Sequence, residues 1–144
     1  MNPQRVELRF PGTRDRIAPA FADFRRVLDA EQLVAAPRYH AELVFDEIVS
    51  NIVRHGAQPG GELAVCVTVE LRPEAIVLTF EDDGVPFDPR VREDPAPRRS
   101  LEDAKAGGSG LMLVRRAASS LDYLRTADGR NRLTVRVARR EQGA

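Results

Sequence analysis

The sequence is poor in the residues on which several classes of protein depend. It has one cysteine, Cys66, and two histidines, which excludes an intrachain disulfide and a cysteine metal cluster and argues against a histidine-rich metal site. It has no tryptophan and few other aromatic residues, so a stacking platform for single-stranded nucleic acid is not expected. The 22 basic and 22 acidic residues leave no net charge, which gives no support for direct binding of nucleic acid.

Long hydrophobic runs are absent as well. No apolar stretch approaches the roughly 20 residues of a membrane span, and the first residues, MNPQRVELRF, lack the apolar segment of a signal peptide. We therefore expect a cytoplasmic protein that does not contact a membrane. The 144 residues suit a single domain, 1–144, with its own hydrophobic core.

The residues that are present recur with periods that predict five strands and three helices. Alternation predicts strands near 5–10, 63–71, 76–82, 122–126 and 132–138, and spacings of three and four predict helices near 13–33, 37–56 and 111–120. The strands come mostly as hairpins. This order predicts an α+β fold, a two-layer α/β sandwich whose mixed, mostly antiparallel sheet is covered on one face by three helices.

The second predicted helix carries a polar stripe. Glu47, Asn51 and His55 stand four residues apart, so each lies about one turn above the last. Val44 and Val53 flank this stripe, which indicates that the helix is largely buried. A buried polar side chain has to meet a partner, a cavity or a metal, because an unpaired buried charge is costly. A satisfied polar stripe beneath a loop explains the same pattern equally well.

The third predicted strand ends in an acidic residue. The period of two that turns its apolar side chains toward the helices continues to Asp82, so this carboxylate points inward where the sheet opens. Gly84 follows, and a glycine lets backbone and ligand approach closely. Such an aspartate suits the amine edge of a planar ligand. An ordinary turn aspartate is the alternative.

A glycine-rich stretch, residues 107–110, comes immediately before the third predicted helix. Its exposed backbone N–H groups, together with the positive end of the helix dipole, favour phosphate. A plain flexible loop is the alternative. The pattern is neither a P-loop nor a dinucleotide fingerprint, because no strand runs directly into it.

In this order the motifs resemble the GHKL (Bergerat-fold) ATPases, and most closely their RsbW-like anti-sigma factor serine/threonine kinases. The resemblance covers nearly the whole chain, and Pro86 is typical of this branch. Its motifs are EIVSN (47–51), RHG (54–56), EDDGVPFDP (81–89), GGSGLMLV (107–114), DY (122–123) and GRNRLT (129–134).

The resemblance implies a role for each matching residue. Asn51 would hold Mg²⁺, and Glu47 would act as general base on the attacking hydroxyl or position it. Asp82 would accept a hydrogen bond from the adenine amino group of ATP, and Gly84 would make room for the ring. Residues from about 87 to 106 would form a lid over ATP. The remaining nucleotide-binding residues would be Gly108, Ser109, Gly110 and Leu111.

The implied function is that of an ATP-dependent protein serine kinase and anti-sigma factor. It would phosphorylate a STAS-type anti-anti-sigma protein and sequester a sigma factor in a partner-switching pathway. The alternative is a nucleotide-dependent binding switch that acts on another target or has no kinase turnover, although the presence of both Glu47 and Asn51 argues against lost turnover. The family tends to form homodimers, and the strand near 5–10 suits a sheet edge where pairing occurs.

A few residues depart from the family pattern or are not assigned a functional role. Ser119 stands where the family often has an aspartate. The strand phase points Leu133 inward and Thr134 outward, so Thr134 is not given the nucleotide-holding role of a threonine found in other superfamily members. Lys105, near the end of the predicted lid, is expected to be solvated, and His55 to cap or pack.

Overall fold

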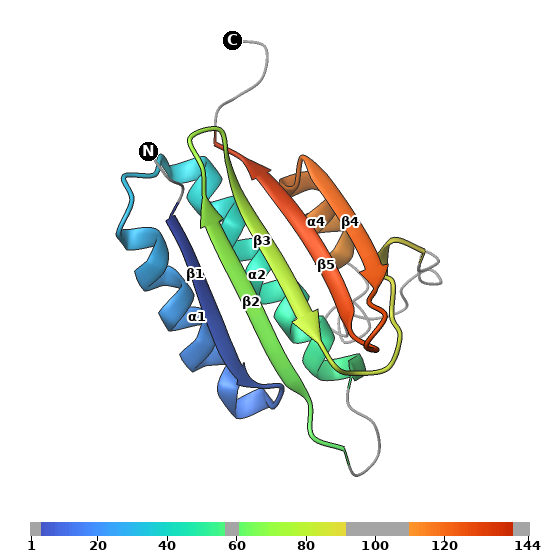
Figure 1. The fold of residues 1–144 in the computed structure, drawn as a ribbon. Helices are drawn as coiled ribbons and strands as arrows, with labels where there is room; N and C mark the ends of the chain where they lie inside the picture. Colours follow the sequence, from blue (N-terminus) through green and yellow to red (C-terminus); the bar gives the residue numbers. More distant parts are fainter. Residues whose placement is uncertain (1–3, 57–60, 92–109, 140–144) are drawn as a thin grey trace, which may run out of the picture.

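The computed structural model describes residues 4–56, 61–91 and 110–139. In chain order the elements are β1 (Gln4–Pro11), α1 (Arg14–Asp29), α2 (Ala35–Gly56), β2 (Ala64–Leu71), β3 (Ala75–Asp82), a 3-10 turn η1 (Pro89–Val91), α4 (Gly110–Ala117), β4 (Ser120–Arg125) and β5 (Asn131–Ala138). The strands form one sheet in the order β1-β2-β3-β5-β4, and every pairing is antiparallel. The helices α1, α2 and α4 lie on the same face of this sheet (Figure 1). The predicted two-layer α+β sandwich is confirmed.

Two helices are shorter than the sequence predicts, each for a local reason. After α1, the N–H groups of Ala30 and Glu31 donate to carbonyls three residues back, which tightens the chain into a turn. After α4, the N–H of Ser119 donates to the carbonyl of Arg136 at 2.7 Å and so joins the chain to β5. This bond begins β4 at the point where periodicity alone would extend the helix.

Aromatic packing fixes α2 over the middle of the sheet. Phe45 of α2 stacks on Phe24 of α1 with ring centroids 4.4 Å apart, and its centroid lies 6.2 Å from that of Phe80 on β3. All three side chains are fully buried. Burial of such rings, together with their favourable pair geometry, stabilises the arrangement. The C-terminal half of α2 is thereby held beside the ends of β3 and β5.

The opposite face of the sheet is polar. Arg132 donates to Glu81 at 2.7 Å, and Arg136 donates to Glu74 at 3.2 Å. Pairs this exposed contribute little to stability, and they suit a face in contact with water. β1 lies at one edge of the sheet, as predicted for the strand near 5–10, and β4 lies at the other. Among the helices of the described residues, none combines the length and the apolar character needed to cross a membrane.

Candidate active site

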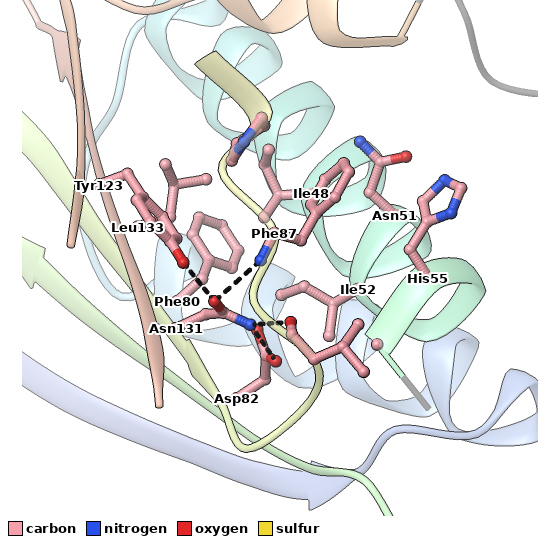
Figure 2. Close-up of a pocket in the computed structure, with 13 residues that line it drawn as sticks. Ile48, Asn51, Ile52, His55, Phe80, Asp82, Phe87, Tyr123, Asn131 and Leu133 are labelled. Carbon is pink, nitrogen blue, oxygen red and sulfur yellow. Dashed lines mark hydrogen bonds between the residues drawn. The ribbon is translucent and has the colours of Figure 1, made fainter. Parts of the chain in front are cut away.

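A pocket lies between the C-terminal half of α2 and the ends of β3 and β5 (Figure 2). Its floor is a row of side chains that pair across neighbouring strands: Phe80 on β3, Leu133 on β5 and Tyr123 on β4. The helix side is Ile48, Asn51, Ile52, His55 and Gly56, the polar end is Asp82 and Asn131, and the cover is Val85, Phe87 and Pro89. An apolar slot closed by a few polar groups is the usual form of a small-molecule site.

Asp82 is the charged group at the polar end of the pocket. Its side chain is 6% exposed, so its predicted inward direction is confirmed. Its Oδ1 accepts hydrogen bonds from the Gly84 N–H at 2.9 Å and from Nδ2 of Asn131 at 3.0 Å. Burial raises the pKa of Asp82, and these two hydrogen bonds oppose the increase because they stabilise the ionised form. The result is an oriented acceptor inside an apolar pocket.

Gly84 and the end of α2 are in backbone contact. A Cβ at Gly84 would stand 2.4 Å from the carbonyl oxygen of Gly56, closer than atoms can approach. The next residue, Val85, donates its N–H to the same oxygen at 3.2 Å. A glycine is therefore required here by the approach of two backbone segments, while its predicted place beside an adenine ring stays a prediction.

The polar stripe of α2 divides at the pocket. Asn51 and His55 line it, whereas Glu47 lies one turn away and is not among the lining residues. Asn51 is 6% exposed, and its side chain makes no hydrogen bond with any other residue that the structure describes. Its carboxamide oxygen is thus free to act as the kind of hard oxygen ligand that Mg²⁺ takes, which fits the predicted metal role. The ring of His55 stacks on Phe87 with centroids 5.2 Å apart, in agreement with packing.

Glu47 is half-buried on α2. Burial raises the pKa of its carboxyl group, the negative charge of Asp46 adds to the increase, and the positive charge of Arg54 opposes it. A carboxylate whose pKa is displaced upward is a better proton acceptor at neutral pH. This environment is compatible with the predicted general base.

Arginine side chains from two elements bind the backbone on either side of the pocket cover. Arg125 at the end of β4 donates to the carbonyl of Gly84 at 2.9 Å, and Arg115 of α4 donates to the carbonyl of Arg90 at 3.0 Å. With the cover so placed, the cavity measures about 30 Å³, room for water and not for a purine. The oriented Asp82 acceptor fits an aminopurine, and the ring itself fits only once the side chains of the cover shift.

The other predicted residues are placed as follows. Gly110 and Leu111 begin α4, and the Leu111 side chain packs in the core, so only its backbone is available to a ligand. Leu133 points inward and Thr134 lies on the opposite face, as predicted. Gly108, Ser109, Lys105 and the greater part of the predicted lid (92–106) lie outside the described residues.

Asn131 and Tyr123 are pocket residues that sequence reasoning missed. The signal for Asn131 was present, because it shares its strand parity with the inward-facing Leu133 and Val135. A polar residue on the inward face at a strand end is the same feature that identified Asp82. Its partners, however, depend on the register of β3 with β5, which no local pattern specifies.

Comparison with known proteins agrees with this site. Residues 10–137 match the family of histidine kinase-like ATPase domains. The chain is 38% identical over 98 residues, covering 68% of each protein, to the serine/threonine-protein kinase BtrW of Bordetella bronchiseptica (strain ATCC BAA-588 / NCTC 13252 / RB50). The resemblance to the RsbW-like GHKL kinases is thereby confirmed, and ATP is the nucleotide that such a domain binds. The chain belongs to the family of histidine kinase-like ATPase domains.

Proposed function

We propose that this chain is an ATP-dependent protein serine/threonine kinase and anti-sigma factor. It phosphorylates a STAS-type anti-anti-sigma protein and sequesters a sigma factor in a partner-switching pathway. One observation carries the proposal: α2 places the half-buried carboxylate of Glu47 one turn from Asn51, whose amide lines a pocket that ends at Asp82. The similarity to a protein named as a serine/threonine kinase supports the phosphotransfer step.

The adenine of ATP occupies the pocket. Asp82 accepts a hydrogen bond from the exocyclic amino group, and the apolar side chains of Ile52 and Leu133 contact the faces of the ring. The side chains of Val85 and Phe87 shift to admit the ring, because the cavity of about 30 Å³ is otherwise too small, while their backbone hydrogen bonds to Asn131 and Gly56 stay in place.

Asn51 and the start of α4 serve the phosphates. The Asn51 oxygen holds Mg²⁺, which when bound neutralises charge on the phosphates during transfer. The backbone N–H groups of Gly108, Ser109 and Gly110, which lead into α4 in the sequence, would donate to phosphate oxygens. The predicted lid, from about 87 to 106, excludes water from the transferred phosphoryl group.

Glu47 acts on the protein substrate. As the oxygen of the partner's serine forms its bond to the γ-phosphorus, Glu47 takes the hydroxyl proton, the bond between the γ-phosphorus and the bridging oxygen breaks, and ADP leaves. The increased pKa of Glu47 favours this transfer, since its carboxylate binds a proton more readily than an ordinary glutamate.

The experiment is transfer of labelled γ-phosphate to purified candidate STAS proteins in the presence of Mg²⁺. We expect transfer to a serine or threonine of one partner, and release of a bound sigma factor when the unphosphorylated STAS protein is added. If the wild-type protein binds ATP but phosphorylates no cognate partner, the nucleotide-dependent binding switch replaces the kinase. Retention of a regulated protein other than a sigma factor would keep the kinase and change only its target.

We also propose that this protein acts in the cytoplasm, where sigma factors act, and that it forms a homodimer. β1 supplies a free edge for pairing, because it has a neighbouring strand on one side only in the described sheet. Light scattering of the purified protein at several concentrations measures the oligomeric state directly.

A further inference from the structure

Asn131, the first residue of β5, is the buried amide at the polar end of the pocket. It stands directly opposite Asp82 in the register of β3 with β5, and 5% of its side chain is exposed. A buried amide is costly unless its donors and acceptors are all paired. Its hydrogen bonds therefore show what holds this end of the pocket together (Figure 2).

Every hydrogen-bonding position of the Asn131 carboxamide is used. Nδ2 donates to Oδ1 of Asp82 at 3.0 Å and to the carbonyl of Val85 at 2.8 Å. Oδ1 accepts from the N–H of Phe87 at 3.2 Å and from the hydroxyl of Tyr123. The Phe87 N–H can only donate and the Val85 carbonyl can only accept, so the amide has one allowed orientation. Nδ2 must face Asp82.

This orientation determines how the Asp82 carboxylate is presented. Both of its hydrogen bonds, from Asn131 and from the Gly84 N–H, end on Oδ1. Within the described part of the chain, no hydrogen bond reaches Oδ2. That oxygen is the acceptor left for a ligand. An ionised oxygen attracts the exocyclic amino group of adenine and repels the carbonyl oxygen that guanine carries at the same position.

We propose that Asn131, held by Tyr123, is the positioning residue that sets the base selectivity of the nucleotide site. It commits Oδ1 of Asp82 to the protein and so presents Oδ2 to the amino group of an aminopurine. The inference rests on the nucleotide site described under the proposed function. The same amide binds Val85 and Phe87, so one side chain sets both the acceptor and the cover above it.

The test is the ratio of the GTP and ATP dissociation constants, measured by calorimetry on the whole protein. In Asn131→Ala we expect this ratio to fall about tenfold or more, the order expected for one hydrogen bond to a charged group. Tyr123→Phe keeps the amide and removes only the hydroxyl that holds it, so we expect a fall of about threefold, as for a neutral hydrogen bond. Thr134→Ala, on the same strand but the opposite face, is the control and should leave the ratio unchanged.

A purely structural role for Asn131 predicts a different result. It would weaken ATP and GTP binding equally, and an unchanged ratio in Asn131→Ala overturns the proposal. If that variant does not fold, an unchanged ratio in Tyr123→Phe does the same. A carboxyl-carbon NMR titration adds an independent measure: the pKa of Asp82 should be higher in Asn131→Ala, because a donor to the charged form is gone. If the wild-type protein binds neither nucleotide, the nucleotide site and this inference are both wrong. If the wild-type protein prefers ATP and both variants keep the same preference, only the inference is wrong.

Discussion

The two ends of the pocket differ in how their polar groups are satisfied. At the sheet end, Asp82, Asn131 and Tyr123 form a closed hydrogen-bonded group before any ligand arrives. At the helix end, neither Asn51, which lines the pocket, nor Glu47, one turn away and outside the lining, makes a side-chain hydrogen bond with another described residue. Groups fixed in advance suit recognition of a rigid base, because no reorganisation is needed on binding. Side chains that make no hydrogen bond within the described part of the chain suit a metal, a phosphate or a hydroxyl, which would bind to them only when the reacting groups come together.

The largest expected effect lies at the helix end. Glu47→Gln keeps the size of the side chain but removes its ability to accept a proton. We expect phosphoryl transfer to the STAS partner to fall by about 10²- to 10⁴-fold, the usual range for a general base, with ATP affinity almost unchanged. Asp23→Asn is the control, because Asp23 is an exposed acidic residue of α1 that does not line the pocket. Transfer at the wild-type rate by the Glu47 variant would place the base elsewhere.

At the sheet end, Asp82→Asn should act on binding. The substitution keeps the shape but replaces one carboxylate oxygen with an NH₂ group, which cannot accept from adenine. We expect ATP affinity to fall by about 1.5–3 kcal/mol, the range for a hydrogen bond to a charged group. Because this contact does not involve the metal, the loss should be the same with Mg²⁺ and with EDTA. Calorimetry measures it, and unchanged affinity would make Asp82 a turn residue only.

Asn51→Ala sharpens the contrast with Asp82→Asn. Loss of the metal ligand should weaken ATP binding and phosphoryl transfer together in the presence of Mg²⁺, by about tenfold or more. In EDTA its affinity for ATP should equal that of the wild type. Parallel calorimetric titrations of both variants in the two buffers give the comparison. A loss that is equally large in EDTA would assign Asn51 to the pocket wall and not to the metal.

Gly84→Ala tests the backbone contact that joins the two ends. The added Cβ meets the carbonyl oxygen of Gly56 at 2.4 Å and its Cα at 2.8 Å, and backbone atoms cannot move aside cheaply. We expect a loss of about 1–3 kcal/mol of unfolding free energy, as for overpacking elsewhere. Gly56→Ala is the matched comparison, because its Cβ meets mainly the flexible end of Leu63 at 3.2 Å. Urea unfolding of both variants should rank Gly84→Ala as the less stable.

The smallest expected effect is a pH dependence of opposite sign in binding and in stability. Because burial raises the pKa of Asp82 above its ordinary value of 3.8, acidification protonates it early and ATP affinity falls. Between the ordinary and the raised pKa, the folded state binds more protons than the unfolded state, so the contribution of Asp82 to stability increases as pH falls. Calorimetry and urea unfolding of the wild type and of Asp82→Asn over this pH range measure the contribution of Asp82 to ATP affinity and to the free energy of unfolding. A binding profile that is identical in the two proteins would contradict the assignment.

Local sequence patterns were sufficient to predict the fold and those features of the site that depend on a single helix or strand. Periodicity predicted the strands, the inward direction of Asp82 and Leu133, and the stripe of α2 that brings Asn51 and His55 to the pocket. It did not predict that Glu47 lies outside the pocket lining or that Asn131 completes the polar end. Both depend on how elements distant in sequence are placed against one another, and alternation within one strand carries no information on the register of its partner.

The ends of the elements show the same limit. The apolar spacing of the first helix continues to Leu33, but α1 stops at Asp29, where hydrogen bonds to carbonyls three residues back tighten the chain. The spacing of the third helix continues to 120, but the hydrogen bond of Ser119 to the β5 backbone ends α4 earlier. Competition between a helix and a tertiary hydrogen bond is decided by the folded structure, so element boundaries are the least predictable part.

The contact between Gly84 and Gly56 gives the site a fixed length. The helix that carries Asn51 and the turn that follows Asp82 are joined through backbone atoms, with the Gly56 carbonyl accepting the N–H of Val85. The backbones of α2 and of this turn are therefore held at a fixed distance here, and only rotation of the Asn51 and Asp82 side chains changes how far apart their polar groups lie. If Asn51 serves the phosphates and Asp82 the base, as proposed, a compound with the correct base and phosphates but a longer or shorter spacer is expected to satisfy one end only.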